Sequence, residues 1–301
     1  MRRLVVLAAC ALALGGGAAR ALRLPAAPSC PVFPASNPWN QRVDKLPAAE
    51  DSDAIIRSIG VDTGLHPDFG SGLYGGAPIG IPVTVVAGSR TPKIRPRFEY
   101  ADESDPGPYP IPRNVRIEGG SDRHAIIVDR ESCRLYELFA LSTDHRSAGS
   151  GAVWSLRSDR LRPAGWTSAD AAGLPILPGL ARWDEVARGR IDHALRFTVE
   201  RTRRAYVYPA RHYASDSTDP SLPPMGLRVR LKAGFDTSGF PRQARVVLEA
   251  LKRYGMIVAD NGSNWYISGA PNKGWSNDQL HTLGKVTGSS FEVVDTSSIK
   301  P

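Results

Sequence analysis

Two predicted turns place a histidine and a carboxylate at the ends of strand-like runs. His212 follows Arg211 in the phrase PARHY, and Asp260 closes an apolar run before an Asn-Gly turn. Connections of this kind concentrate binding and catalytic residues, and a carboxylate can orient a histidine that acts as a general base. We therefore predict that His212 and Asp260 are catalytic and line one polar cleft, with Arg211 beside them as a substrate-binding residue.

Glu137 is the third predicted catalytic residue. It shares a face of a predicted strand with Leu135 and Phe139, where a glutamate either is buried with a partner or lines a cleft. Hydrolysis of a glycosidic bond needs two carboxyl groups held about 5–10 Å apart, and Glu118 and Asp122 lie on or beside other predicted strands. A structural pair of Glu137 with an arginine is the alternative, and the sequence leaves both open.

The segment from Asp260 to Tyr266 combines a carboxylate, amides and two aromatic rings. Sugars have apolar ring faces and many hydroxyl groups, which aromatic rings, amides and carboxylates match. We predict substrate contacts from Asn261, Trp265 and Tyr266 in this segment, and from His124 at the start of another strand. The alternative for the tryptophans is a place in the core of a β sandwich.

The sequence contains none of the common nucleophile, zinc or nucleotide motifs in a suitable context. His124, His193 and His212 are far apart, and no cluster of His and Cys has metal-ligand spacing. His193 lies on the apolar face of a predicted strand, which favours a core histidine with a hydrogen-bond partner. We expect no metal and no cofactor.

Residues 1–21 have the pattern of a secretory signal peptide: a basic start, a short apolar run and a small-x-small site that ends at Ala21. A lipoprotein box surrounds Cys10, but too few apolar residues precede it, and lipid anchoring is disfavoured. No other apolar run approaches the roughly 20 residues that span a bilayer. We therefore predict export to the periplasm or the extracellular space, without a membrane span.

Removal of the signal peptide leaves two cysteines, Cys30 and Cys133. An even pair in an oxidising compartment favours a disulfide. Such a bridge closes a loop of about 100 residues and stabilises the fold by up to ~4.7 kcal/mol on the chain-entropy argument. Two free thiols are the alternative.

The chain has a formal net charge of +8. Part of the excess lies in a basic stripe of arginines and one lysine between Arg196 and Lys232. Such a stripe attracts anionic polymers, and export favours an acidic polysaccharide over nucleic acid as the partner. The alternative is a solvated strand face, and the sequence does not indicate an oligomeric state.

With 29 Gly and 25 Pro among 301 residues, the chain is rich in turns. Residues 22–50 form a predicted irregular, Pro-rich leader, and residues 51–298 a single domain. Residues 241–254 have helical periodicity, whereas most other apolar runs alternate as strands do. We predict a mostly β fold, an antiparallel sandwich or jelly roll with one packed helix and several short helical turns. The predicted strands cover residues 79–87, 94–100, 125–129, 134–141, 151–157, 193–199, 227–232, 256–260 and 265–268, with hairpins at 125–141 and 256–268.

Several long phrases of the chain are characteristic: SDPGPYPIP, AGLPILPGL, DHALRFTV, YPARHY and ADNGSNWYISGAP. Together they resemble a family of secreted bacterial proteins that has no assigned activity. The resemblance covers roughly residues 37–296 and implies export and a single domain. It carries no catalytic residue over to this chain.

These features favour a secreted carbohydrate-active enzyme that acts on an extracellular, acidic polysaccharide, either as a glycoside hydrolase or as a lyase. The carboxylates support hydrolysis, and a His or Tyr base assisted by Arg supports β-elimination. The alternative is a non-catalytic secreted module that binds a glycan or the cell surface, which would explain the aromatic and basic residues without an active site.

Overall fold

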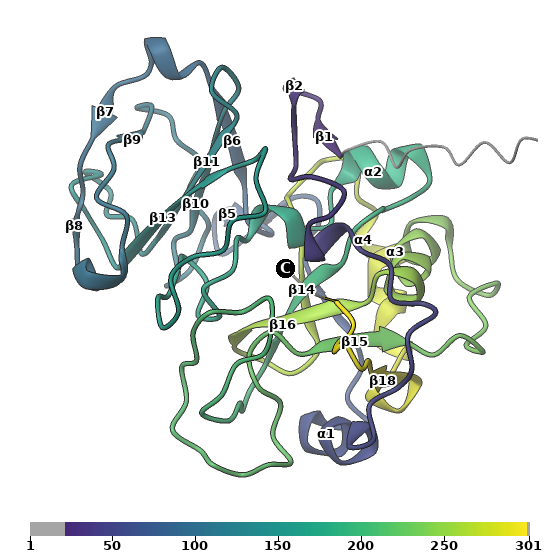
Figure 1. Cartoon of the computed structure of the whole chain (residues 1–301). Coiled ribbons are helices and arrows are strands. Elements are labelled where there is room, and N and C mark those ends of the chain that lie inside the picture. Colours follow the sequence, from purple (N-terminus) through teal and green to yellow (C-terminus); the bar gives the residue numbers. More distant parts are fainter. Residues whose placement is uncertain (1–21, 300–301) are drawn as a thin grey trace, which may run out of the picture.

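The computed structural model describes residues 22–299, which form the two lobes shown in Figure 1. A four-stranded sheet with several short strand pairs forms the first lobe, and a six-stranded sheet with the α-helices forms the second. The mostly β fold with packed helices is confirmed. The predicted signal peptide, with Cys10, lies outside the described residues.

The first lobe is built on a sheet with the strand order β13-β11-β10-β6. Its strands are β6 (Val83–Val86), β10 (Ala125–Asp129), β11 (Arg134–Phe139) and β13 (Ser150–Ser155). β10, β11 and β13 pair antiparallel, which confirms the predicted hairpin at 125–141, and β6 lies parallel to β10. β10 is buried on both faces, because Ile126 and Val128 pack into one core cluster and Ala125 and Ile127 into another.

Short strand pairs surround this sheet. They are β1 (Arg23–Leu24) with β2 (Ala27–Pro31), β4 (Leu73–Tyr74) with β5 (Ala77–Pro78), β7 (Lys93–Ile94) with β9 (Tyr109–Pro110), and β8 (Arg97–Phe98) with β12 (Ser147–Ala148). The predicted strand at 94–100 is divided into β7 and β8 around Pro96, since proline has no N–H to donate to a sheet. The leader, predicted to be irregular, contains the β1–β2 hairpin.

The second lobe holds a sheet with the order β18-β15-β16-β14-β17-β3. Its strands are β3 (His66–Asp68), β14 (Leu195–Val199), β15 (Arg228–Leu231), β16 (Met256–Asn261), β17 (Tyr266–Ser268) and β18 (Phe291–Val293). β14 is parallel to β16 and β17 is parallel to β3, while the other neighbours pair antiparallel. The pairing is therefore mixed, and the prediction of antiparallel strands holds for only part of each large sheet.

The predicted hairpin at 256–268 is wrong. β16 and β17 do not pair with each other, because β14 lies between them. The turn after Asn261 instead crosses the end of β14, where the N–H of Gly262 donates to the Val199 carbonyl and the Thr198 hydroxyl donates to the Ser263 carbonyl. An Asn-Gly turn between two apolar runs indicates a reversal of the chain, but it does not exclude an inserted strand.

Helices cover the apolar side of the six-stranded sheet. They are α1 (Ser52–Ile59), α2 (Trp183–Arg188), α3 (Arg242–Arg253) and α4 (Asn277–His281). The 3-10 turns are distributed over both lobes: η1 (Pro38–Asn40), η2 (Gly88–Arg90), η3 (Ala101–Glu103), η4 (Leu177–Gly179), η5 (Thr282–Lys285) and η6 (Gly288–Ser290). α3 is the predicted helix and buries Ala244, Val247, Leu248 and Leu251, as its periodicity requires.

The six-stranded sheet has one apolar and one polar face. Leu195, Phe197 and Val199 of β14 lie in the core cluster that includes α3. Because side chains alternate along a strand, Arg196 and Thr198 point to the opposite face. There Thr198 pairs with Tyr266 across the sheet. The pairing continues from β17 to β3, where Tyr266 opposes His66 and Ser268 opposes Asp68. This polar face carries the functional candidates described below.

The predicted disulfide between Cys30 and Cys133 is present, with their Cα atoms 5.2 Å apart. Both cysteines are buried, and the bridge ties β2 to the turn before β11. Disulfides persist in oxidising compartments, which agrees with export. Within residues 22–299, none of the helices has the length and apolar character needed to cross a bilayer.

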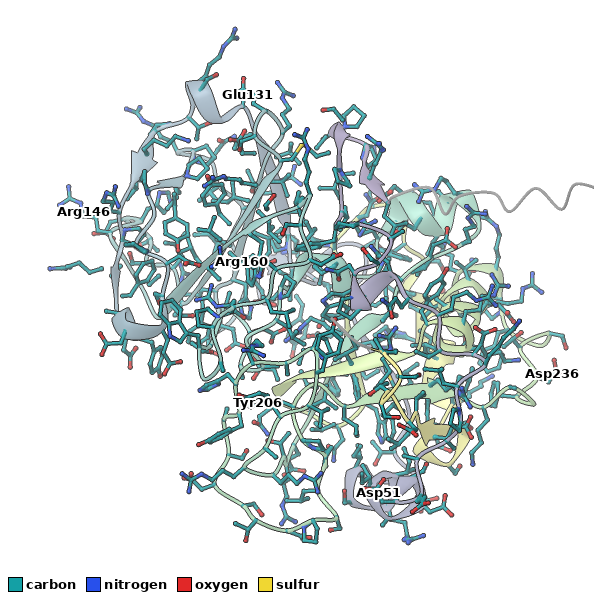
Figure 2. All side chains as sticks on the ribbon, in the orientation of Figure 1. Asp51, Glu131, Arg146, Arg160, Tyr206 and Asp236 are labelled. Atoms are coloured by element: carbon teal, nitrogen blue, oxygen red, sulfur yellow. A yellow bond between two sulfur atoms is a disulfide. The ribbon has the colours of Figure 1, made fainter. Side chains whose placement is uncertain are left out.

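Three arginines of the predicted basic stripe are buried, whereas Arg201, Arg204 and Lys232 are exposed. Arg196, Arg228 and Arg230 are at most 9% exposed. Arg228 donates to the carbonyls of Pro38, Gln41 and Tyr254, and Arg230 pairs with Glu292. These guanidinium groups hold the leader and neighbouring strands together, so their charge is not offered to a polymer. Exposed charges such as those of Glu131, Arg146 and Asp236 lie elsewhere on the molecule (Figure 2).

Candidate active site

A pocket of about 280 Å³ lies where the two lobes meet, and we call it the acidic pocket. Side chains from both sheets and from the segments between them line it: Tyr100, Glu103, Phe139, Ser150, Thr167, Ser168, Ala169, Asp170, Ala171, His212, Ala214 and Asp260. Its volume is near the lower end of the roughly 300–1,000 Å³ typical of small-molecule sites. Such a pocket suits a single ring with polar substituents.

His212 and Asp260 both line the acidic pocket, Asp260 from β16 and His212 from the irregular connection between β14 and β15. His212 Nδ1 lies 2.7 Å from the Ala171 carbonyl oxygen. Since only a protonated nitrogen can donate to a carbonyl, this contact assigns the hydrogen to Nδ1. Nε2 of His212 then faces Glu103, with 3.8 Å to its Oε2 atom.

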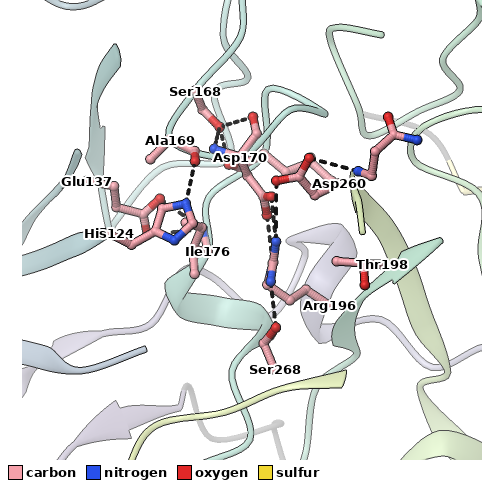
Figure 3. A network of polar contacts seen from close by, with 12 residues as sticks. His124, Glu137, Ser168, Ala169, Asp170, Ile176, Arg196, Thr198, Asp260 and Ser268 are labelled. Atoms are coloured by element: carbon pink, nitrogen blue, oxygen red, sulfur yellow. Dashed lines mark hydrogen bonds and ion pairs between the residues drawn. The ribbon is translucent and has the colours of Figure 1, made fainter. Parts of the chain in front are cut away.

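Asp260 belongs to a buried network centred on Arg196 (Figure 3). The Arg196 guanidinium donates to both carboxylate oxygens of Asp170, from Nε at 2.8 Å and from one terminal nitrogen at 2.7 Å. It also donates to the Ser268 hydroxyl at 2.5 Å. Asp260 lies farther away, with 3.8 Å between its Oδ2 and the nearest Arg196 nitrogen. One cation is therefore shared unequally by two carboxyl groups.

Burial and this unequal sharing together raise the pKa of Asp260. Burial and the neighbouring Asp170 raise the pKa of Asp260 to about 8, against the opposing effect of Arg196. The Asp260 side chain is nevertheless 26% exposed, because it forms part of the pocket wall. At neutral pH, Asp260 is therefore a protonated carboxylic acid with access to a ligand, as a general acid must be.

Glu103 is a second carboxyl group in the same pocket, and the sequence reasoning did not select it. It ends η3, and its Oε2 accepts a hydrogen bond from the Thr167 N–H at 2.8 Å. Asp170 was missed as well. Neither residue lies on a predicted strand or in a recognisable motif, so no local signal marks them. Their positions depend on the docking of the two lobes.

His124, predicted to bind substrate, is 2% exposed and does not line the acidic pocket. It forms an ion pair with Glu118 at 2.5 Å and donates from Nε2 to the Ala169 carbonyl at 2.9 Å. Burial lowers the pKa of His124, but the hydrogen bond and the charge of Glu118 outweigh it and raise the pKa to about 9. His124 is thus a buried cation that fixes the segment before Asp170.

Glu137, predicted to be catalytic, is fully buried and lies outside the pocket lining. Its carboxyl oxygens accept hydrogen bonds from the N–H groups of Ile176 and Leu177 at 2.9–3.0 Å. Burial raises the pKa of Glu137 to about 8, although these N–H groups oppose the shift. Glu137 therefore anchors the start of η4 to β11, which is a structural role and corrects the prediction.

Trp265 is a core residue and not a sugar platform. It is 0% exposed, donates from Nε1 to the Gly60 carbonyl, and stacks with Phe197 and Phe291. Its backbone has a φ of 62°, which turns the ring inward at the end of the crossing turn. The prediction of a substrate contact from Trp265 is therefore wrong.

Two other predicted binding residues hold backbone segments. Arg211 donates from Nε to the Arg162 carbonyl at 2.9 Å, next to the acidic pocket but outside its lining. The Asn261 side chain accepts from the hydroxyls of Thr202 and Ser215 and donates to the Glu200 carbonyl. Both residues fix the long connection that carries His212.

Tyr266, by contrast, lines a separate pocket of about 420 Å³, which we call the His66 pocket. Its ring stacks on that of His66, with 4.0 Å between the ring centroids. Burial lowers the pKa of His66 and raises the pKa of Asp68 in the same wall. The exposed Tyr74 is a further lining residue. Tyr266 and Asp260 therefore line different pockets.

The described residues contain no group of three or more His, Cys, Asp and Glu side chains that could hold a metal ion. His193, expected in the core, is fully buried and pairs with Glu185 at 3.0 Å. Comparisons with protein-family models, curated proteins and solved structures find no match to this chain. The chemistry of the pockets is therefore the basis for assigning a function.

Proposed function

We propose that the protein is an exported carbohydrate-active enzyme that hydrolyses a glycosidic bond in the acidic pocket, with Asp260 as the general acid. The observation that carries this proposal is the place of Asp260 in the pocket wall, beside an Asp170 that is ion-paired with Arg196; burial and Asp170 raise the pKa of Asp260. Glycosidases use a carboxylic acid of raised pKa to protonate the leaving oxygen, and burial beside a like charge is one way to obtain it.

Glu103 is the second carboxyl group that this reaction requires. Its Oε2 is 3.8 Å from Nε2 of His212, which is too long for a direct hydrogen bond and suits a bridging water or sugar hydroxyl. The gap supports a role for Glu103 as the base that activates water. His212, whose ring is oriented by the Ala171 carbonyl, is the second contact of that water.

Hydrolysis fits the acidic pocket better than β-elimination does. An elimination on an acidic sugar needs a cation beside the sugar carboxylate to stabilise the developing charge. Among the described residues that line this pocket, none is arginine or lysine. Arg196 lies behind the wall and is held by Asp170 and Ser268. The pocket therefore suits a neutral sugar ring at the point of cleavage.

Incubation of the protein with a panel of neutral and acidic polysaccharides tests this proposal. We expect new reducing ends without an ultraviolet-absorbing unsaturated product. Asp260→Asn and Glu103→Gln should each abolish the release, while Asp102→Asn, at the exposed neighbour of Glu103, should not. Binding without any product would favour the non-catalytic module, and an unsaturated product would favour a lyase.

A further inference from the structure

A third pocket, of about 390 Å³, adjoins the acidic pocket, and we call it the arginine pocket. Its lining includes Arg134, Arg160, Trp154 and Trp166. Trp166 is followed directly by Thr167 of the acidic pocket. The two pockets therefore have walls that are continuous along the chain.

Arg162 joins the two pockets and is itself fully engaged. It donates to the carbonyls of Glu103 and Thr167, which belong to the acidic pocket, and pairs with Asp105 of the arginine pocket at 2.6 Å. Its guanidinium carbon lies 5.6 Å from the ring centroid of Trp154 and 5.4 Å from that of Trp166. These contacts fix the indole rings, and Asp105 neutralises the charge of Arg162.

The other two arginines of this pocket keep their charge available. Arg134 and Arg160 are exposed, and neither forms an ion pair within residues 22–299. They differ in this respect from Arg196, Arg228 and Arg230 of the predicted stripe, which are buried and bonded internally. Figure 2 marks Arg160, together with Arg146 on the outer side of the first lobe.

We propose that the arginine pocket is a subsite for an acidic sugar residue, next to the neutral residue held in the acidic pocket. Guanidinium groups bind carboxylate or sulfate oxygens with directed, charge-assisted hydrogen bonds, which Arg134 and Arg160 supply. The partly exposed Trp166 supplies a flat apolar surface for the sugar ring. The substrate is then a heteropolysaccharide in which an acidic residue neighbours a neutral one.

This inference rests on the proposed function only for the position of the cleaved bond, because binding can be measured without turnover. The test is calorimetric titration of the Asp260→Asn protein with short fragments of hyaluronan and glucuronoxylan, in which acidic residues neighbour neutral ones, each beside its carboxyl-reduced counterpart. We expect at least one acidic fragment to bind roughly tenfold more tightly than its reduced form. Adding Arg134→Gln or Arg160→Gln should remove that difference, and adding Arg146→Gln, the matched control on an exposed arginine, should keep it.

The outcomes separate the two proposals. Equal affinity for acidic and reduced fragments, no binding of any fragment, or unchanged affinity in both arginine variants would overturn the subsite. Trp166→Ala provides a second readout, since it should weaken both forms of a fragment alike. Arginine-dependent binding with no hydrolysis by the unsubstituted protein would refute the proposed function and leave the subsite standing. Hydrolysis that neither arginine substitution alters would refute the subsite and leave the proposed function standing.

Discussion

The retained proton of Asp260 has a consequence for stability that needs no substrate. In the unfolded chain an aspartate loses its proton near its ordinary pKa of 3.8, whereas in the folded protein the pKa of Asp260 is about 8. Between these values the folded state binds a proton that the unfolded state has released. The free energy of unfolding that this group contributes therefore decreases as the pH rises from about 4 to about 8. Asparagine cannot titrate, so Asp260→Asn removes this dependence.

The expected size follows from the shift. Each pH unit between the two pKa values changes the free energy of unfolding by at most about 1.4 kcal/mol. The Asp260 side chain is 26% exposed, and solvent reduces the effect. From pH 5 to pH 8 we therefore expect Asp260→Asn to gain about 2 kcal/mol relative to the unsubstituted protein, rather than the roughly 4 kcal/mol of a fully desolvated group.

Urea unfolding of both proteins at pH 5, 6.5 and 8 measures this difference, since all other titrating groups are common to the two chains. The amide of asparagine can donate to Asp170 as the protonated acid does, so the pair of proteins differs mainly in charge. A constant difference between the two proteins across this pH range would refute the assignment of a proton to Asp260. A variant that loses stability relative to the unsubstituted protein as the pH rises would refute it as well.

Three further substitutions test the network and the anchors around it. Arg196→Met leaves the buried Asp170 without its cation, and we expect urea unfolding to show that the free energy of unfolding falls by about 3–5 kcal/mol. A decrease below about 1 kcal/mol would contradict the central place of this arginine in the network. Glu137→Ala deprives two buried N–H groups of their acceptor, so thermal or urea unfolding should show about 2–4 kcal/mol of destabilisation. Glu137→Gln keeps an acceptor and should have a stability nearer to that of the unsubstituted protein. A Gln variant that is less stable than the Ala variant would exclude the anchoring role. Joint replacement of Cys30 and Cys133 with serine should lower the free energy of unfolding by about 2–5 kcal/mol in the same assay. The pH dependence of activity should not change, and a change would show that the bridge affects the pocket.

Features that depend on local periodicity were predictable from the sequence. The α3 helix follows from the spacing of Ala244, Val247 and Leu251, and the β10–β11 hairpin from two alternating runs around a polar turn. The Cys30–Cys133 bridge follows from an even cysteine count in a chain predicted to be exported. In each case the physical reason for the feature lies in one short segment of the sequence or in the number of cysteines.

Features that depend on how distant segments dock were not predictable. Trp265 follows a turn that looks exposed in sequence, but β14 inserts between β16 and β17 and the ring enters the core. Glu103 and Asp170 reach the acidic pocket from irregular connections of different parts of the chain. Asp260 was found because it lies at the end of the buried run of β16. His212 was found although the apolar run before it is not a strand, since it lies on the irregular connection between β14 and β15. Glu137 shows that an acid on an apolar strand face can equally anchor a neighbouring turn.

The most direct test of the account is the pH dependence of kcat/KM for glycan hydrolysis, which reports the ionisation of the free enzyme. With Asp260 as the acid, hydrolysis requires its proton, and its pKa is about 8. We predict that kcat/KM falls as the pH rises through about 8, and that Asp260→Asn has no measurable activity at any pH. A rate that continues to rise above pH 8, or full activity of Asp260→Asn, would contradict the assignment of Asp260 as the general acid.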